Sequence, residues 1–385
     1  MLTERLEFSP ERDAEIFATI PAAPAVFLLR GDASEPYVSK TANLRRRLQR
    51  LLGPVEERTR KLNLRDRVRT IQYVATGSDF ESGFLLYKTL RTEFPKTYAN
   101  RLRFRFAPLV KLHLDNEFPR ASVTTRLGRL HGKNLYFGPF LSRVAAEKFM
   151  NDSLDFFKMR RCVDDLHPDP AFPGCIYSEM KMCLAPCFKG CTDEEYSAEV
   201  MRVQSYFDSS GDSLLRELSA QREATSAALA FEDAAAIHVK IEKLQPLAGQ
   251  VPEVVRRIDR FSALVIQPSH IAGSVTFFKI EQTHISDPIS FSIEPAEHMK
   301  SQSMESRVEQ ALAGGPAEKV KSALETMEHL AILKRWYYRS SRIGEIFFAD
   351  TNGELPMRRV VRGISRVFRG EKAETEKSTP PEVPG

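Results

Sequence analysis

The first hundred residues alternate short apolar runs with amphipathic segments, a pattern typical of a small α/β unit. Apolar runs at residues 25–29 and 36–38 predict two strands joined by a turn. Leucines at helical spacing over residues 43–52 predict a helix, which Gly-Pro ends. A third strand at 71–75 and a helix at 79–94 complete the unit.

The rest of the chain predicts an α+β protein with several domains. Residues 106–160 predict strands followed by a helix. A long helical pattern runs from 193 to 244, and Pro246 is expected to stop it. Residues 261–293 alternate as in an antiparallel meander, and residues 318–338 predict a further helix. We divide the chain into an α/β domain (1–105), linker strands and helix (106–160), a cysteine-rich loop (161–191), a helical hairpin (192–248), a β-rich domain with helix (249–370) and a disordered tail (371–385).

Composition narrows the class of protein. The 385 residues suffice for two or three domains with their own cores. No apolar run reaches the 18 residues of a membrane span, and the charged first ten residues do not resemble a secretory signal. We therefore expect a cytoplasmic protein without a membrane partner. The net charge of +5 is only a weak indication of nucleic-acid binding.

The distribution of positive charge is more informative than its total. Residues 45–69 hold only three acidic residues, against the cations Arg45, Arg46, Arg47, Arg50, Arg58, Arg60, Lys61, Arg65, Arg67 and Arg69. This density predicts salt-dependent, sequence-independent binding to the phosphates of double-stranded DNA. The alternative is a solvated helix face. A second basic stripe at 358, 362, 366 and 369 has helical spacing and is either a further contact or, as we favour, part of a soluble tail.

Four cysteines lie close together in the sequence. Their spacing is Cys162-x12-Cys175-x7-Cys183-x3-Cys187, and Cys191 follows shortly after. Such a group in a large chain without an export signal favours metal binding over disulfides. Four thiolates from one loop can hold an ion or a cluster. Buried, reduced cysteines without a metal are the alternative.

Two segments together resemble the UvrC family. Residues 24–30 with 37–48, and 81–96, are similar to its N-terminal GIY-YIG nuclease domain. The stretch Tyr136-Phe-Gly-Pro, followed by a cysteine block that ends in Cys183-Leu-Ala-Pro-Cys187, is similar to the segment after that domain. The resemblance implies a [4Fe–4S] cluster at the four cysteines, with zinc as the alternative.

The GIY-YIG resemblance implies a site that has lost part of its chemistry. The family's second tyrosine, its lysine and its helical arginine match Tyr37, Lys40 and Arg47, but its first tyrosine falls on Phe27 and its metal-binding glutamate on Leu86. Phenylalanine cannot transfer a proton, and leucine cannot hold a hard cation. Mg²⁺ or Mn²⁺ would be needed only if the site were active.

Other groups of that family pattern have two alternative matches each in this sequence. The family's asparagine falls near Tyr98 or on Asn100. Glu81 or Glu93 is a conceivable replacement for the missing carboxylate, although Glu81 lies about 140° around the helix from Leu86.

The helical pattern at 227–244 resembles the UVR motif, through which UvrC and UvrB engage each other. The resemblance implies a partner surface at Phe231, Glu232, Ala235 and Ile241. The family's Arg-Asp pair is replaced by His238-Val239 here, which puts recognition of that partner in doubt. A purely structural helical hairpin is the alternative.

Together, these features predict a UvrC-like, DNA-binding protein of nucleotide excision repair whose nuclease-like domain does not incise DNA. Its expected partners are double-stranded DNA and a UvrB-like protein. Two alternatives stay open, and with them whether the protein is an enzyme: an active, short UvrC-type incision endonuclease, and a protein-interaction module without a DNA role.

Overall fold

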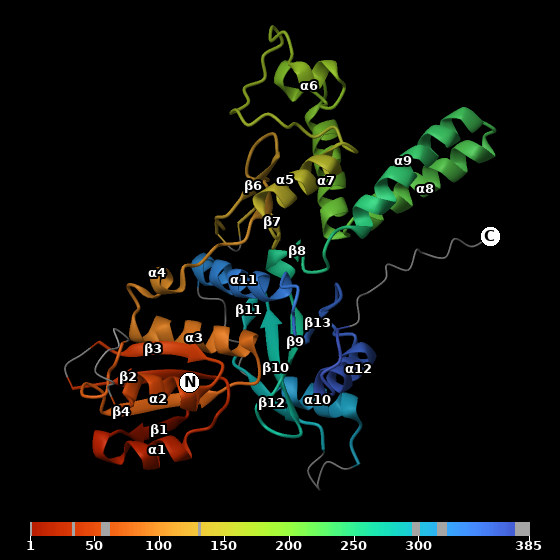
Figure 1. Cartoon of the computed structure of the whole chain (residues 1–385). Coiled ribbons are helices and arrows are strands. Elements are labelled where there is room, and N and C mark those ends of the chain that lie inside the picture. The colour runs from red at the N-terminus through yellow and green to blue at the C-terminus, as the bar shows by residue number, and fades with distance from the viewer. Residues whose placement is uncertain are drawn as a thin grey trace.

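The computed structural model describes residues 2–32, 35–54, 62–129, 132–294, 301–313 and 322–373. Figure 1 shows an N-terminal domain, a middle region that carries a projecting helical hairpin, and a C-terminal domain. Helices and three antiparallel sheets make up these parts, so the coarse prediction of a multidomain α+β protein is confirmed. Within the described ranges, every helix is too short or too polar to cross a lipid bilayer.

The N-terminal domain is built on a four-stranded sheet in the order β1-β4-β2-β3. Its central strand β2 is buried along almost its whole length, and Phe27 lies opposite Ser39 on β3 and Tyr73 on β4. The strands and helices of this domain are β1 (Glu4–Glu7), α1 (Asp13–Thr19), β2 (Ala25–Arg30), β3 (Tyr37–Thr41), α2 (Leu44–Leu52), β4 (Thr70–Ala75), α3 (Asp79–Glu93) and α4 (Tyr98–Leu102).

Helix α2 has the limits that the sequence predicted. The Asn43 side chain accepts the Arg46 backbone N–H at 3.0 Å and so caps the first turn. Gly53 ends the helix, with its N–H bonded to the Gln49 carbonyl. The four leucines of α2 are buried against the sheet, which leaves Arg46 and Arg50 on the exposed face.

The middle region combines a small sheet in the order β6-β5-β7-β8 with helices and the cysteine-rich loop. Its elements are β5 (Leu109–Leu112), β6 (Ala121–Thr124), β7 (Leu135–Gly138), α5 (Arg143–Leu154), α6 (Ile176–Glu179), α7 (Asp193–Asp208) and β8 (Arg256–Arg257). Tyr196 and Tyr206 of α7 are buried and join this helix to the sheet and to α5.

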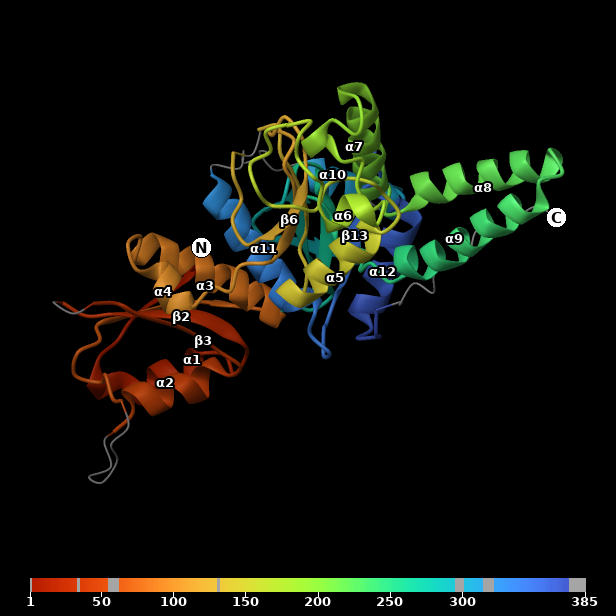
Figure 2. The ribbon, with the colours of Figure 1, turned by 90° about the horizontal axis from the view of Figure 1, so that it is seen from above.

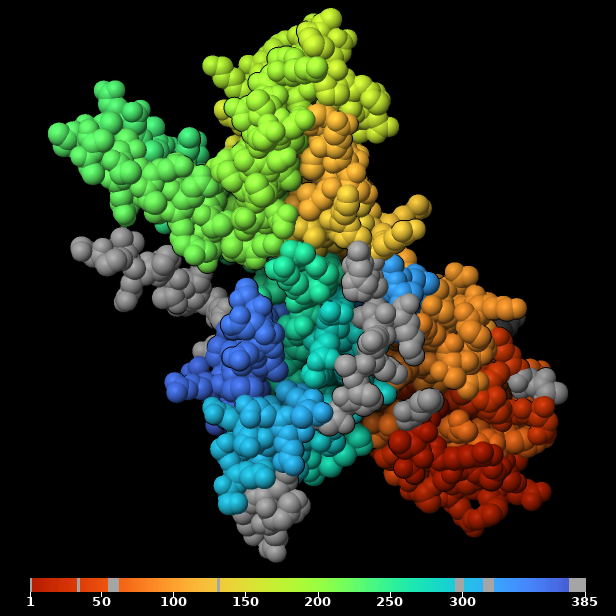
Figure 3. Space-filling view, turned by 180° about the vertical axis from the view of Figure 1, so that it is seen from behind, coloured from red at the N-terminus to blue at the C-terminus, as the bar shows by residue number. Residues whose placement is uncertain are grey.

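The hairpin consists of α8 (Asp212–Ala227) and α9 (Phe231–Gly249) and projects from the body (Figures 1 and 3). The expectation that Pro246 stops the second helix is wrong, because Pro246 lies inside α9. Proline removes one backbone donor, and so near a helix end it costs a single hydrogen bond. Its own carbonyl still accepts the Gln250 N–H at 3.0 Å.

The C-terminal domain has a five-stranded sheet with helices on both faces. Alternate residues of β9 and β10 pack against α10 and α12 on one face and against α11 on the other. The elements are β9 (Ala263–Pro268), β10 (Ser274–Glu281), β11 (His284–Ile285), β12 (Ile289–Ser292), α10 (Met304–Ala313), α11 (Ala323–Tyr337), β13 (Glu345–Phe348) and α12 (Met357–Phe368).

Helix α12 corrects the view that the second basic stripe belongs to a soluble tail. Val360, Ile364 and Val367 are buried against the sheet. Arg366 forms two hydrogen bonds of 2.8 Å with the Glu345 carboxylate. The stripe therefore belongs to a packed helix, on which Arg358, Arg362 and Arg369 are exposed and Arg366 is held by Glu345.

Candidate functional site

Two of the predicted site residues meet on the outer edge of the N-terminal sheet. Tyr37 lies on β3 and Arg47 on α2, and the Arg47 Nη2 donates a hydrogen bond of 2.8 Å to the Tyr37 hydroxyl. The ring of Phe27 lies 6.1 Å from that of Tyr37 and is completely buried. The structure thus places a cation and a phenol together, with an apolar ring where the resemblance assigns a second hydroxyl.

Lys40 and Leu86 lie apart from this pair and both line a cavity between α3 and the C-terminal domain. Lys40 forms an ion pair with Asp79, which the sequence reasoning did not single out. Asp79 also pairs with Arg339 of the segment after α11. Burial raises the pKa of Asp79, but the two cations outweigh burial and hold it below the usual value. Asp79 therefore serves as the counter-ion of Lys40 and Arg339.

The replacement carboxylates are engaged elsewhere. Glu81 is buried and accepts the Gly77 backbone N–H at 2.8 Å, and Glu93 pairs with Arg30 at 2.8 Å. Leu86 itself is half-buried and offers no oxygen. Both candidate replacement carboxylates are therefore already engaged in other contacts.

Tyr98, one candidate for the position of the family's asparagine, belongs to a buried network between the domains. The hydroxyls of Tyr87 and Tyr98 donate to the two oxygens of Glu328 on α11, at 2.8 and 2.6 Å. Arg91 donates to the Tyr87 hydroxyl and to Glu325. Burial and then Glu328 raise the pKa of Tyr98 to about 12, so the phenol stays protonated and acts as a donor.

The predicted DNA-binding cations fall into two groups. Arg46 and Arg50 are exposed one turn apart on α2, and their side chains have no partner in the described part of the chain. Arg45, by contrast, donates to the Ile20 carbonyl, and Arg65 holds Asp13 and two backbone carbonyls. The second group therefore stabilises the domain. Arg58, Arg60 and Lys61 lie outside the described residues.

The structure brings the four predicted cysteines together on one loop. All four are half-buried and reduced. Burial, and after it the neighbouring thiols of Cys162, Cys187 and Cys175, raises the pKa of the Cys183 thiol to about 11. Burial and then the thiols of Cys175 and Cys162 raise the pKa of Cys187 in the same way. The thiols of Cys162, Cys175, Cys183 and Cys187 are therefore near enough to influence one another's ionisation.

The donor set fits a metal or cluster that binds thiolates. Cys162 Sγ accepts a hydrogen bond from Arg160 at 3.4 Å, and Cys183 Sγ accepts the Ala185 N–H at 3.3 Å. Hydrogen bonds to sulfur stabilise thiolate ligands and tune the group that they hold. The raised pKa values of Cys183 and Cys187 mean that these two thiols stay protonated at neutral pH unless a cation compensates their negative charge.

The predicted partner residues differ in their exposure. Phe231 at the start of α9 is 64% exposed, next to Leu229 in the turn at 72%. Glu232 and Ala235 are also exposed, whereas Ile241 is buried inside the hairpin. The tip therefore offers an apolar surface, and Ile241 holds the two helices together.

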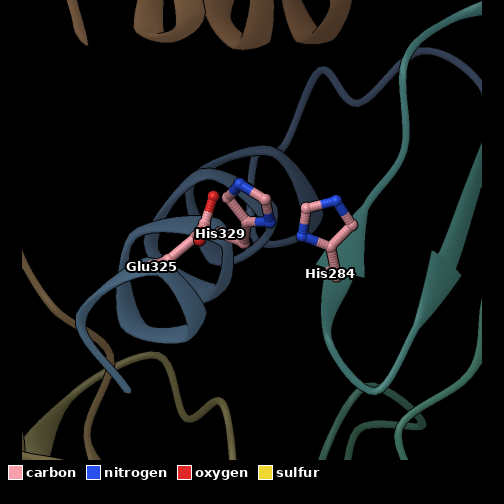
Figure 4. Close-up of side chains that lie close together, drawn as sticks. All are labelled: His284, Glu325 and His329. Carbon is pink, nitrogen blue, oxygen red and sulfur yellow. The ribbon is translucent and has the colours of Figure 1, made fainter. Parts of the chain in front are cut away.

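One buried group of potential metal ligands was not anticipated from the sequence. His284 of β11 faces Glu325 and His329 of α11, with ligand atoms within 4.8 Å of one another (Figure 4). His329 Nδ1 accepts the Ile285 backbone N–H at 3.0 Å, and burial lowers the pKa of this imidazole to about 3. A neutral ring with Nδ1 so engaged carries its proton on Nε2 and has no lone pair for a metal. The group therefore fits a polar core contact.

Comparisons with known proteins point in one direction. The family model "UvrC/Cho excinuclease, middle domain" matches residues 108–206. The chain is 30% identical over 235 residues to UvrABC system protein C of Ectopseudomonas mendocina. These residues make up 60% of this chain and 38% of that protein. The chain is 25% identical over 354 residues to UvrABC system protein C of Alcanivorax borkumensis. The alignment covers 87% of this chain and 58% of that protein. No solved structure matches the chain significantly.

Proposed function

This chain belongs to the UvrC-like family, and from that membership we propose that it acts in nucleotide excision repair as a DNA-binding protein that does not incise DNA by the GIY-YIG route. It spans 38% to 58% of the length of these relatives, so their activity extends to it only as a proposal.

The observation that carries the proposal is the composition of the nuclease-like site. Arg47 and Tyr37 are held together at 2.8 Å. The resemblance to the family assigns Phe27 and Leu86, which lack a hydroxyl and a carboxylate, to the positions of those two groups. Phosphodiester cleavage needs a metal, or an equivalent charge, at the developing oxyanion and a group that handles the proton. A site with the cation alone binds a phosphate without completing the reaction.

A nicking assay tests this part of the proposal. Supercoiled plasmid, damaged and undamaged, is incubated with the protein and Mg²⁺ or Mn²⁺, alongside the Arg47→Ala variant. We expect no relaxed product from either protein. Nicking by the wild type that disappears in Arg47→Ala would overturn the proposal and establish the second candidate, an incision endonuclease with a rearranged metal ligand.

The DNA contact is proposed to run over the exposed face of α2. Arg46 and Arg50 point outward one turn apart, and each can neutralise a phosphate. The Arg46→Gln/Arg50→Gln variant should reduce the slope of log affinity against log salt by about 2 for duplex DNA, measured by fluorescence anisotropy.

A matched control is available on α12. Arg358 and Arg362 are likewise exposed one turn apart. Their double replacement by glutamine removes the same charge and should leave duplex binding close to that of the wild type. Equal losses in both double variants would reduce the DNA contact to a general charge effect and refute the assignment to α2.

The loop of four cysteines is proposed to hold a [4Fe–4S] cluster or zinc. Support comes from the shared environment of the thiols and from the hydrogen bonds to Cys162 and Cys183. Anaerobic purification followed by iron, sulfide and zinc analysis distinguishes the two. A protein free of all three elements, when expressed in iron- and zinc-replete cells, would refute the assignment.

The hairpin tip is proposed to dock a UvrB-like protein. The exposed Phe231 and Leu229 supply the apolar surface. Phe231→Asp should abolish co-purification with such a partner, whereas Met201→Asp, at an equally exposed apolar position on α7, should not. Retention of the partner by Phe231→Asp would leave the hairpin with a structural role only.

A further inference from the structure

A cavity of about 630 Å³ lies between the N-terminal domain and helix α11. Figure 2 shows α3 and α11 side by side at this boundary. Helix α3 contributes Gly83 and Leu86, the segment after α4 contributes Phe104, and α11 contributes Trp336. Its volume lies in the range of sites that bind small organic molecules, about 300 to 1,000 Å³.

The charge of the cavity wall is strongly positive. Arg103, Arg105, Lys334 and Arg335 line it, and their side chains have no hydrogen-bond or ion-pair partner within the described ranges. Burial lowers the pKa of Lys334, and Arg105 lowers it further, because the two cations repel each other. Asp79 is the one acidic residue of the wall, and Lys40 and Arg339 already neutralise it. The wall therefore favours an anion.

The remaining surface of the cavity is aromatic and apolar. Phe104 is half-buried. Trp336 also lines the cavity but is only 6% exposed, because Phe80 and Arg342 pack against its ring. In proteins that bind single-stranded nucleic acids, cations contact the phosphate backbone and aromatic rings stack on the bases. Leu86, at the site where a nuclease would hold its metal, adds to the apolar part.

We propose that this cavity holds a nucleotide of a single-stranded nucleic acid, with its base against Phe104, beside the buried Trp336, and its phosphates on Arg103, Arg105, Lys334 and Arg335. Three of these cations, Arg103, Arg105 and Arg335, are exposed at the mouth, so they reach phosphates that continue beyond the bound nucleotide. Four positive charges also exceed the roughly two negative charges of one terminal phosphate. The site therefore fits a strand better than a free nucleotide. This inference rests on the proposed function only in taking the strand to be DNA.

Trp336 is the single tryptophan of the chain and reports directly on the cavity. Thymidine oligomers of about ten nucleotides should quench its fluorescence in a saturable manner. The Lys334→Gln/Arg335→Gln variant removes two phosphate contacts and should weaken the binding that quenching reports roughly tenfold at physiological salt. The Arg358→Gln/Arg362→Gln variant should match the wild type.

A second variant tests the cavity without changing its charge. A Cβ at Gly83 would meet no atom within 4 Å, so Gly83→Leu fills open space and suits a helix interior. It should abolish quenching and leave thermal unfolding unchanged or slightly raised.

The outcomes are distinct. Quenching that is unaffected by both cavity variants would overturn the inference. Equal quenching by thymidine monophosphate at the same concentration would instead identify a mononucleotide site and overturn the claim of a strand. Failure of the proposed function shows elsewhere, as duplex binding that is indifferent to Arg46→Gln/Arg50→Gln.

Discussion

Glu81 predicts a specific dependence of stability on pH. Its side chain is only 4% exposed, and its carboxylate accepts one backbone N–H, from Gly77. Burial raises the pKa of Glu81 from 4.5 to about 7, against the smaller opposing effect of that hydrogen bond.

The sign follows from proton linkage. Between pH 4.5 and 7 the folded protein binds more protons at Glu81 than the unfolded chain, so its stability falls as the pH rises. The contribution is fully present below the pKa of the unfolded chain and is lost as the pH passes about 7. The full contribution of Glu81 to the free energy of unfolding is about 3 kcal/mol. About 2–3 kcal/mol of it is lost between about pH 5 and about pH 8.

Glu81→Gln isolates this effect because glutamine keeps an oxygen that can accept the Gly77 N–H but cannot ionise. Urea unfolding is followed through the fluorescence of Trp336. Its ring centroid lies 5.2 Å from that of Phe80, the neighbour of Glu81 on α3. Relative to Glu81→Gln, the wild type should lose about 2–3 kcal/mol between about pH 5 and about pH 8. Parallel pH profiles for the two proteins would refute the reasoning.

Three further predictions follow from buried contacts. Tyr87→Phe removes a donor to the buried Glu328 and should cost about 1–3 kcal/mol in urea unfolding; an unchanged midpoint would contradict this. Leu48→Ala empties a fully buried position and should cost about 2–5 kcal/mol by the same measurement, and a loss below 1 kcal/mol would argue against the packing of α2. Cys183→Ser should lower bound iron or zinc in elemental analysis more than Cys191→Ser; equal losses would shift the ligand assignment.

Sequence patterns predicted α2 well because local chemistry sets its limits. Asn43 caps the helix, Gly53 ends it, and the leucines between them define the buried face. The meander of β9, β10 and β12 was predicted for a similar reason, since its alternation reflects two packed faces.

Contacts between distant parts of the chain were beyond such reasoning. The two-residue strand β11 exists through its pairing with β10, and no local pattern marks it. Glu325 and His329 look like ordinary polar residues of a helix, yet α11 turns them toward β11 and α3. The Lys40–Asp79–Arg339 ion pairs likewise join residues whose proximity only the packed domains create.

The network around Glu328 has a consequence for the order of events during protein synthesis. Tyr87 and Glu328 are 241 residues apart, and Phe80 and Phe84 of the same α3 face pack on Phe278 of β10. When the first hundred residues leave the ribosome, this aromatic face has no cover. The N-terminal domain can bury its own core early, but this face of α3 stays exposed until the C-terminal domain has been translated, and in that interval it is a site where aggregation can begin.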